Sequence, residues 1–221
     1  MSQEIKIEKK ASEVIQPLTG VQARKAIRSR EDLSGASLRG MTLDNINAVG
    51  AILRKTDLAN ADLSHGLLVN PNFYRASLHG ASVNNTIFLG GDLVKTSFKQ
   101  TDMSESALIG VDAQNASFEG ANLTNAALVS ADLQDADFTG ANLTNARLAT
   151  LNVAGADFTD ADLKGARAYH IDWSKAKVPP VTIPEPFVKL PDWGWSLFLG
   201  GLIGTIALII YTLIRKNRNR S

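Results

Sequence analysis

The 221-residue chain contains no cysteine, which excludes disulfide bonds, thiolate metal sites and a cysteine nucleophile. It also lacks the short motifs of common active sites: there is no G-x-S-x-G, no H-E-x-x-H and no phosphate-binding loop. Its three histidines, His65, His79 and His170, fall at outward positions on different faces or coils of the repeat described below. The sequence therefore predicts neither an enzyme nor a cofactor or metal site.

A strong overall charge is missing as well, since the formal net charge is only +1. Seven basic and three acidic residues give +4 in residues 1–30, and ten basic and seventeen acidic residues give −7 in residues 31–175. Six basic and two acidic residues give +4 in residues 176–221. Basic ends that flank an acidic middle are not the pattern of a nucleic-acid-binding protein. Residues 1–30 contain no long apolar run, so no secretory signal peptide is expected there.

What the chain does contain is a repeat of five residues. An apolar residue recurs at every fifth position from Leu33 to Trp173, giving 29 consecutive units without an insertion. A small residue usually stands two positions before it, and Asp, Asn, Ser or Thr usually stands between them. A period of five fits neither an α-helix nor a β-strand. It fits a chain that turns a corner every five residues, with two side chains per unit pointing inward.

Units such as ADLQD at residues 131–135 and ANLTN at residues 121–125 match the consensus A-(D/N)-L-x-x. On these residues the chain resembles the pentapeptide-repeat family over residues 31–175. The resemblance implies an all-β fold, a right-handed quadrilateral β-helix with four units per coil. Residues 118–126 recur almost unchanged at residues 138–146, which also indicates twenty residues per coil. The 29 units then make about seven coils, roughly 34 Å long at strand spacing.

Positions twenty apart should stack in such a coil. One inner column is predicted to change from leucine to phenylalanine along the chain: Leu38, Leu58, Leu78, Phe98, Phe118, Phe138 and Phe158. The outward Asp and Asn residues are expected to hydrogen-bond to local backbone rather than to bind a metal ion.

One outer face breaks the polar pattern. Its outward positions form an apolar stripe, made of Val49, Leu67, Val69, Ile87, Leu89, Ile109, Val129 and Tyr169. An apolar patch of several hundred Å² usually marks a contact surface. The stripe is therefore predicted to bind a protein partner or a second copy of the chain, the alternative being that the chain's own termini cover it.

The remaining segments are predicted to be appendages of the β-helix. Residues 1–30 form a basic cap segment with a short helix at residues 21–28, and the proline-rich residues 176–192 form a stiff, unpacked linker. Residues 193–214 contain no charge and are long enough for a transmembrane helix, followed by a basic tail at residues 215–221. The residues expected to anchor it are Trp193, Trp195, Gly200, Gly204, Tyr211, Arg215 and Lys216.

These features predict a non-catalytic, single-pass membrane-tethered scaffold that binds a membrane-protein complex or self-associates through the stripe. A tail-anchored arrangement with a cytoplasmic repeat domain is slightly favoured. The basic tail supports the opposite topology. Two alternatives come from the family resemblance: a DNA-mimicking protein that binds topoisomerases, and a secreted effector that is targeted to a host membrane.

Overall fold

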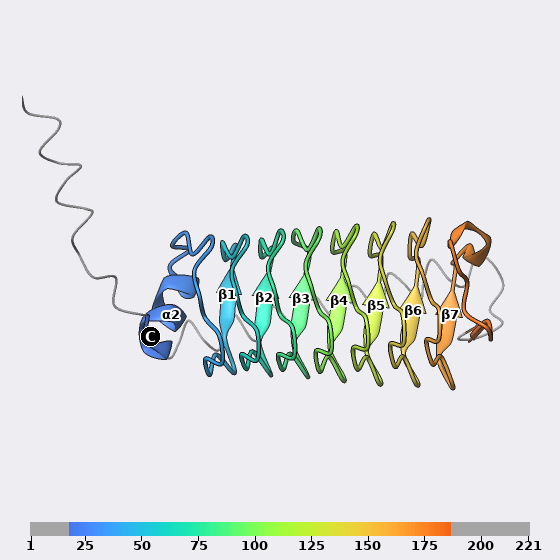
Figure 1. The fold of residues 1–221 in the computed structure, drawn as a ribbon, viewed down its shortest axis with the longest axis horizontal. Coiled ribbons are helices and arrows are strands. Elements are labelled where there is room, and N and C mark those ends of the chain that lie inside the picture. Colours follow the sequence, from blue (N-terminus) through green and yellow to red (C-terminus); the bar gives the residue numbers. More distant parts are fainter. Residues whose placement is uncertain (1–17, 187–221) are drawn as a thin grey trace, which may run out of the picture. The chain divides into compact units, whose positions relative to one another are not determined.

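The structure is a computed structural model, and it describes residues 18–186. The first element of the described part is helix α2 (Gly20–Arg28), after which the chain winds through successive coils that each contribute one short strand (Figure 1). The 3₁₀-helix η1 (Trp173–Lys175) and strand β8 (Glu185–Pro186) follow the last coil. The seven coil strands are β1 (Asn47–Val49), β2 (Leu67–Val69), β3 (Ile87–Leu89), β4 (Ala107–Ile109), β5 (Ala127–Val129), β6 (Arg147–Ala149) and β7 (Arg167–Tyr169).

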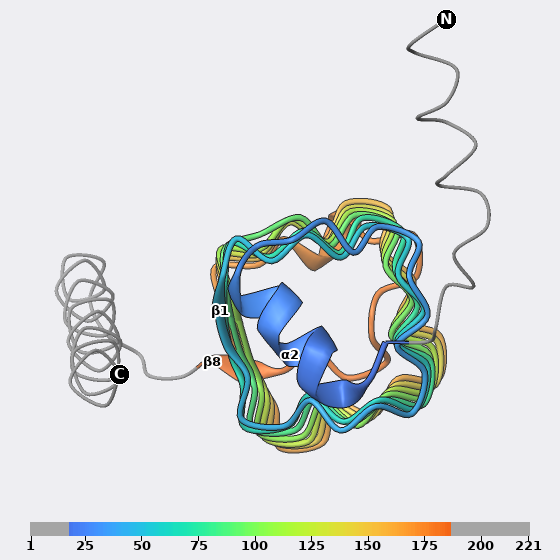
Figure 2. The same ribbon diagram turned by 90° about the vertical axis from the view of Figure 1, so that its left-hand side faces the viewer.

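Viewed down its axis, the coil has four sides (Figure 2). We number the faces by their first central residue: Leu33, Leu38 and Leu43 begin the first three, and Ala48 begins the fourth. The fourth face is a sheet in the order β1 to β8, in which β1 to β7 pair in parallel with partner residues twenty apart. On the other three faces neighbouring coils meet mostly through single parallel bridges. The predicted all-β solenoid of about seven twenty-residue coils is confirmed.

The corners have a fixed backbone conformation. Every fifth residue from Arg30 to His170 has a positive φ, between 48° and 75°. Glycine and asparagine tolerate this region best, which explains why they recur after the central residues. Thr150 is a β-branched residue held at φ 54° and is therefore a strained position.

The interior is filled by stacked columns, and every central residue from Leu33 to Trp173 is buried. The predicted leucine-to-phenylalanine column is present. Its four phenylalanine rings lie nearly parallel, with successive centroids 5.1, 4.6 and 4.8 Å apart. Trp173 closes the column, because its ring meets Phe158 edge-on at 5.4 Å. Aromatic pairs at these separations add attraction beyond the apolar area that they bury.

Five hydroxyl side chains replace the usual alanine at inward positions and are buried: Thr56, Thr86, Thr96, Thr101 and Ser106. Each threonine donates a hydrogen bond of 2.7–2.9 Å to the carbonyl oxygen of a central residue in the preceding coil, as Thr96 does to Phe73. Among the residues described, Ser106 has the one buried side-chain oxygen or nitrogen atom without a hydrogen-bond partner.

The outward Asp and Asn residues hold the turns, as predicted. A side-chain oxygen of each accepts a hydrogen bond of 2.9–3.2 Å from the backbone N–H two residues later, and fifteen such bonds run along the coils. For example, Asp132 accepts from Gln134. These side chains satisfy turn N–H groups that would otherwise bond to water.

The N-terminal end of the core is closed by α2, at the position where a short helix was predicted. Thr19 and Gln22 form a capping box at its start. Its apolar side chains Ala23, Ala26 and Ile27 are buried as part of the core. Arg24 forms an ion pair with Asp44 of the first coil.

The C-terminal end corrects the prediction of an unpacked linker over residues 176–192. Lys177 and Val178 form backbone hydrogen bonds with Ala156 and Phe158 of the last coils, and Pro180 and Pro184 are buried. The proline-rich composition suggested a solvated tether, but prolines also suit a segment that needs few N–H donors. Residues 187–192 lie outside the described part of the chain.

Asp157 in the last coils contacts this C-terminal segment. Its carboxylate accepts hydrogen bonds from the hydroxyl and backbone N–H of Thr159, and it pairs with Lys177 at 3.0 Å. The Thr159 hydrogen bonds and the Lys177 contact lower the pKa of Asp157 from 3.8 to about 2.

We expect Phe118→Ala to destabilise the fold by about 3–5 kcal/mol, because a stacked column cannot collapse around one gap. Urea denaturation followed by circular dichroism measures the change. Phe118→Leu is the matched control and should cost about 1.5 kcal/mol or less, since leucine fills the same column in earlier coils. A loss below about 1 kcal/mol for the alanine variant would contradict the packing of this column.

Ser106→Ala should leave the free energy of unfolding unchanged or raise it by up to about 1 kcal/mol, because it removes a buried hydroxyl that bonds to nothing in the described residues. Thr96→Val should instead cost about 1 kcal/mol, since the bond to the Phe73 carbonyl is lost. Parallel denaturation curves compare the two. Equal losses in both variants would indicate that the Ser106 hydroxyl is bonded in solution.

The lowered pKa of Asp157 predicts a pH-dependent contribution. Its stabilisation is complete above the ordinary carboxyl pKa of 3.8 and is lost as pH falls through about 2. The difference in unfolding free energy between wild type and Asp157→Asn should therefore shrink between pH 5 and pH 2. Asp160→Asn, an exposed neighbour, is the control for removing one negative charge. A difference that does not change over this range would contradict the assigned contacts.

Candidate interaction surface

The predicted apolar stripe lies on the outer side of the sheet formed by β1 to β7. In each strand the middle residue is buried in the core, and the residues on either side of it point outward. The outward residues align exactly twenty positions apart, so Leu89, Ile109 and Val129 are successive partners in the sheet register. The alignment of the stripe predicted from the sequence is therefore present.

Exposure varies along the stripe. Val49 at its N-terminal end is 43% exposed, while Val69, Ile87, Leu89, Ile109, Val129 and Tyr169 are half-buried. Leu67 is only 8% exposed, which corrects its assignment as a contact residue. Its register partners Asn47 and Ile87 lie on both sides of it in the sheet and leave little of it accessible.

The ends of this face are polar. Asn47 occupies the outward position in β1, and Arg147 and Arg167 occupy it in β6 and β7. Arg167 pairs with Glu185 of β8 at 3.1 Å, and the ring of Tyr169 lies 5.7 Å from that of His170. Between Asn47 and Arg147 the outward strand positions carry no charge. The surface is thus a straight apolar band with polar ends.

Catalytic groups do not gather on this surface. His65 and His170 occupy left-handed corner positions in different coils, and His79 points outward from the second face. Within residues 18–186, no three His, Asp or Glu side chains are arranged to hold a metal ion. The outer face of the sheet offers a regular shape and exposed apolar area, which are properties of a protein-binding surface.

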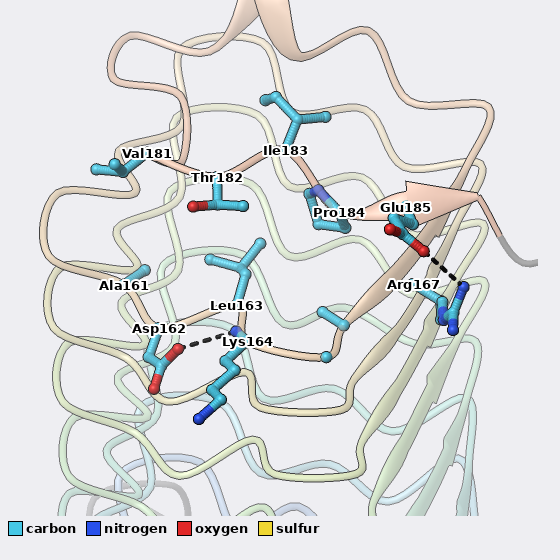
Figure 3. A pocket seen from close by; sticks show the side chains of 12 residues that line it. Ala161, Asp162, Leu163, Lys164, Arg167, Val181, Thr182, Ile183, Pro184 and Glu185 are labelled. Atoms are coloured by element: carbon cyan, nitrogen blue, oxygen red, sulfur yellow. Dashed lines mark hydrogen bonds and ion pairs between the residues drawn. The ribbon is translucent and has the colours of Figure 1, made fainter.

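A cavity of about 460 Å³ lies at the C-terminal end of the coils, between residues 161–167 and residues 181–185 (Figure 3). Its acidic side chains already have local partners. Asp162 accepts a hydrogen bond from the Lys164 backbone, and Glu185 pairs with Arg167. The sequence did not predict this cavity, because it results from the packing of the proline-rich segment onto the last coil.

Sequence reasoning also missed a cluster of basic side chains on the edge between the first and second faces. Arg54 and Arg75 lie 5.4 and 5.2 Å from the ring centre of Tyr74, one on the preceding coil and one beside it. The available signal was the recurrence of Lys55, Arg75 and Lys95 at twenty-residue intervals. This recurrence is found only when charged residues at equivalent positions of successive coils are compared.

The predicted membrane anchor, residues 193–214 with Arg215 and Lys216, lies outside the described residues. Within residues 18–186, no helix has the length and apolar character needed to cross a membrane.

Comparisons with known proteins agree with the coil architecture. A model of the pentapeptide repeat region matches residues 81–158, and a model of eight-copy pentapeptide repeats matches residues 32–68 and 141–176. A sequence comparison with curated proteins gives no match.

Three solved structures illustrate the similarity. HetL, a pentapeptide repeat protein involved in heterocyst differentiation regulation in Nostoc, is 23% identical, with 69% of this chain and 86% of HetL covered at a TM-score of 0.36. Trypsin-treated QnrB1, a plasmid-mediated fluoroquinolone resistance protein, is also 23% identical. The match covers 77% of this chain and 95% of QnrB1, with a TM-score of 0.38. A pentapeptide repeat protein of the Arabidopsis thaliana thylakoid lumen is 25% identical. The match covers 64% of this chain and 73% of that protein, with a TM-score of 0.21. Because the two family models together match more than half of the chain, the chain belongs to the pentapeptide repeat family.

Proposed function

We propose that this chain is a non-catalytic interaction protein that binds a protein partner through the outer face of the β1–β7 sheet. The observation that carries the proposal is the uncharged band between Asn47 and Arg147. The other three faces carry outward Asp, Asn, Ser and Thr residues that hold turns or meet water. Along the described coils, the sheet face is the one on which large aliphatic side chains recur at these positions from coil to coil.

The sheet suits binding because it is rigid. Parallel strands in continuous register hold the outward side chains at fixed spacing, so little conformational entropy is lost on association. Half-buried aliphatic side chains in a row also exclude water once a partner covers them. An interface of this kind gains most of its affinity from a few central residues. Leu89 and Ile109 lie at the centre of the band and are the expected contributors.

We also propose, from the sequence, that the protein is attached to a membrane. The uncharged residues 193–214 and the basic residues that follow them suit a single span. We propose that the span tethers the repeat domain close to a membrane-protein complex. The arrangement that we propose has the repeat domain on the cytoplasmic side.

The distribution of charged residues along the coils gives less support to the alternative function, a DNA mimic that binds topoisomerases. Duplex DNA presents negative charge at uniform spacing along its whole length. Here, residues 31–100 carry six basic and six acidic residues, whereas residues 101–170 carry three basic and ten acidic residues. Only half of the coils are acidic, and a uniform mimic would need all of them.

A photoreactive residue at Leu89 or Ile109 should crosslink to another protein in native membranes, because both positions lie at the centre of the proposed surface. Mass spectrometry of the adducts identifies the partner. The matched control is Ser104, an outward and half-buried position on the third face. Adducts at Ser104 but at neither sheet position would refute the proposal.

The variant Leu89→Ser separates binding from folding. Its side chain is outward and half-buried, so the free energy of unfolding should change by no more than about 1 kcal/mol. Capture of the crosslinked partner should fall at least about fivefold if Leu89 is a central contact. Normal capture by a folded Leu89→Ser protein would move the binding surface elsewhere.

A further inference from the structure

The edge between the first and second faces carries four basic side chains on three consecutive coils, which we call the basic arm: Arg54, Lys55, Arg75 and Lys95. All four are exposed, and none forms a salt bridge with the residues described in the structure. Strands in neighbouring coils are about 4.8 Å apart, so stacked cations on them repel one another.

The basic arm is held in place by its surroundings. Tyr74 lies between Arg54 and Arg75, and both guanidinium groups lie within 5.4 Å of its ring centre. This contact orients the two cations. It also occupies the ring, which is then unavailable for stacking on a nucleic-acid base. The arm is therefore suited to an anionic partner that is recognised by charge alone.

The backbone adds a second observation. Lys55, Arg75 and Lys95 all occupy left-handed corner positions, with φ of 56°, 58° and 59°. On the same edge Gly35, Asn115 and Gly155 occupy the equivalent positions, and these residue types suit the conformation better. Three long cations in succession are thus not explained by the local fold.

Farther along the same edge the charge reverses. Asp112, Asp132, Asp135 and Asp137 form an acidic arm that begins in the coil next to Lys95, where Asp112 bridges to Asp92. No carboxylate of this arm forms a salt bridge in the described part of the chain. On balance the edge is basic in the coils of Lys55 and Arg75, where Asp57 is its one carboxylate, and acidic in the coils of Asp112 and Asp135. A second copy turned end for end brings the basic coils of one copy toward the acidic coils of the other.

We propose that two copies of this chain associate antiparallel along this edge, with the basic arm of each against the acidic arm of the other. A two-fold axis between the Lys95 and Asn115 coils places Arg75 opposite Asp135 and Lys95 opposite Asn115. Such an interface is isologous, because one patch serves on both copies. It is distinct from the apolar stripe, so it does not depend on the proposed function.

The size of the edge determines the expected strength. One face is about 34 Å long and about 16 Å wide at strand spacing, or about 540 Å² per copy, which is below the size of a standard interface. The dimer should therefore be weak and strongly dependent on ionic strength.

Sedimentation velocity of the purified full-length chain in nonionic detergent tests the association. We expect a concentration-dependent dimer at about 50 mM NaCl, with a dissociation constant at least about tenfold higher at about 300 mM. Leu89→Ser should dimerise as the wild type does, because the sheet face is not involved. A monomer at low salt, or association that strengthens with salt, overturns the proposal.

Charge changes test the complementarity. Lys55→Glu/Arg75→Glu/Lys95→Glu should abolish dimerisation, and so should Asp132→Asn/Asp135→Lys/Asp137→Asn, in which asparagine keeps the turn hydrogen bonds. A mixture of the two variants should associate, because the edge of the first variant is acidic and the edge of the second is basic. Far-ultraviolet circular dichroism confirms folding, which is expected because the altered side chains are exposed or half-buried. Failure of the mixture to associate, or dimerisation of the first variant alone, overturns the proposal.

The absence of cysteine makes the orientation measurable. A single cysteine at Asn115, next to the two-fold axis, should crosslink rapidly with a short bis-maleimide at low salt. A single cysteine at Ser34 in the first coil should not, because antiparallel pairing separates the two first coils. Equal crosslinking at both sites would indicate parallel association and contradict the antiparallel dimer.

Discussion

The rest of the structure depends on one constraint, the hydrogen bonding of each coil to the next at an offset of twenty residues. Backbone groups of neighbouring coils pair on all four faces, as between Leu38 and Asp57 or between Phe118 and Asp137. This pairing satisfies backbone groups that would otherwise be buried without partners. It also decides which side chains point inward. A slip of one residue in any coil would expose its core column and break its turns at once.

Within this frame the four faces have different roles. On three of them outward Asp and Asn side chains accept hydrogen bonds from turn N–H groups, so their polarity serves the fold. The fourth face forms a regular sheet and needs no such turn residues between its corners, which leaves its outward positions free to carry aliphatic side chains. The proposed binding surface and the turn-forming surface therefore lie on different faces around the axis.

The five-residue period was enough to predict the core, because every central residue from Leu33 to Trp173 is buried as the pattern requires. The aspartate and asparagine hydrogen bonds also followed from local chemistry. What the sequence did not reveal depends on contacts between coils and at their ends. The low exposure of Leu67 comes from its neighbours in the sheet, and the burial of Pro180 and Pro184 comes from packing on the last coil. The basic arm was hidden because its members are twenty residues apart.

The unbroken succession of corners has a consequence for how such a chain can diverge. Adding or removing twenty residues restores every column, and the near-identity of residues 118–126 and 138–146 is what the duplication of one coil would leave. Adding or removing five residues keeps each side chain inside or outside but turns everything downstream by a quarter of a revolution. A single repeat unit is thus an angular step, able to redirect the surface of later coils without altering their sequence.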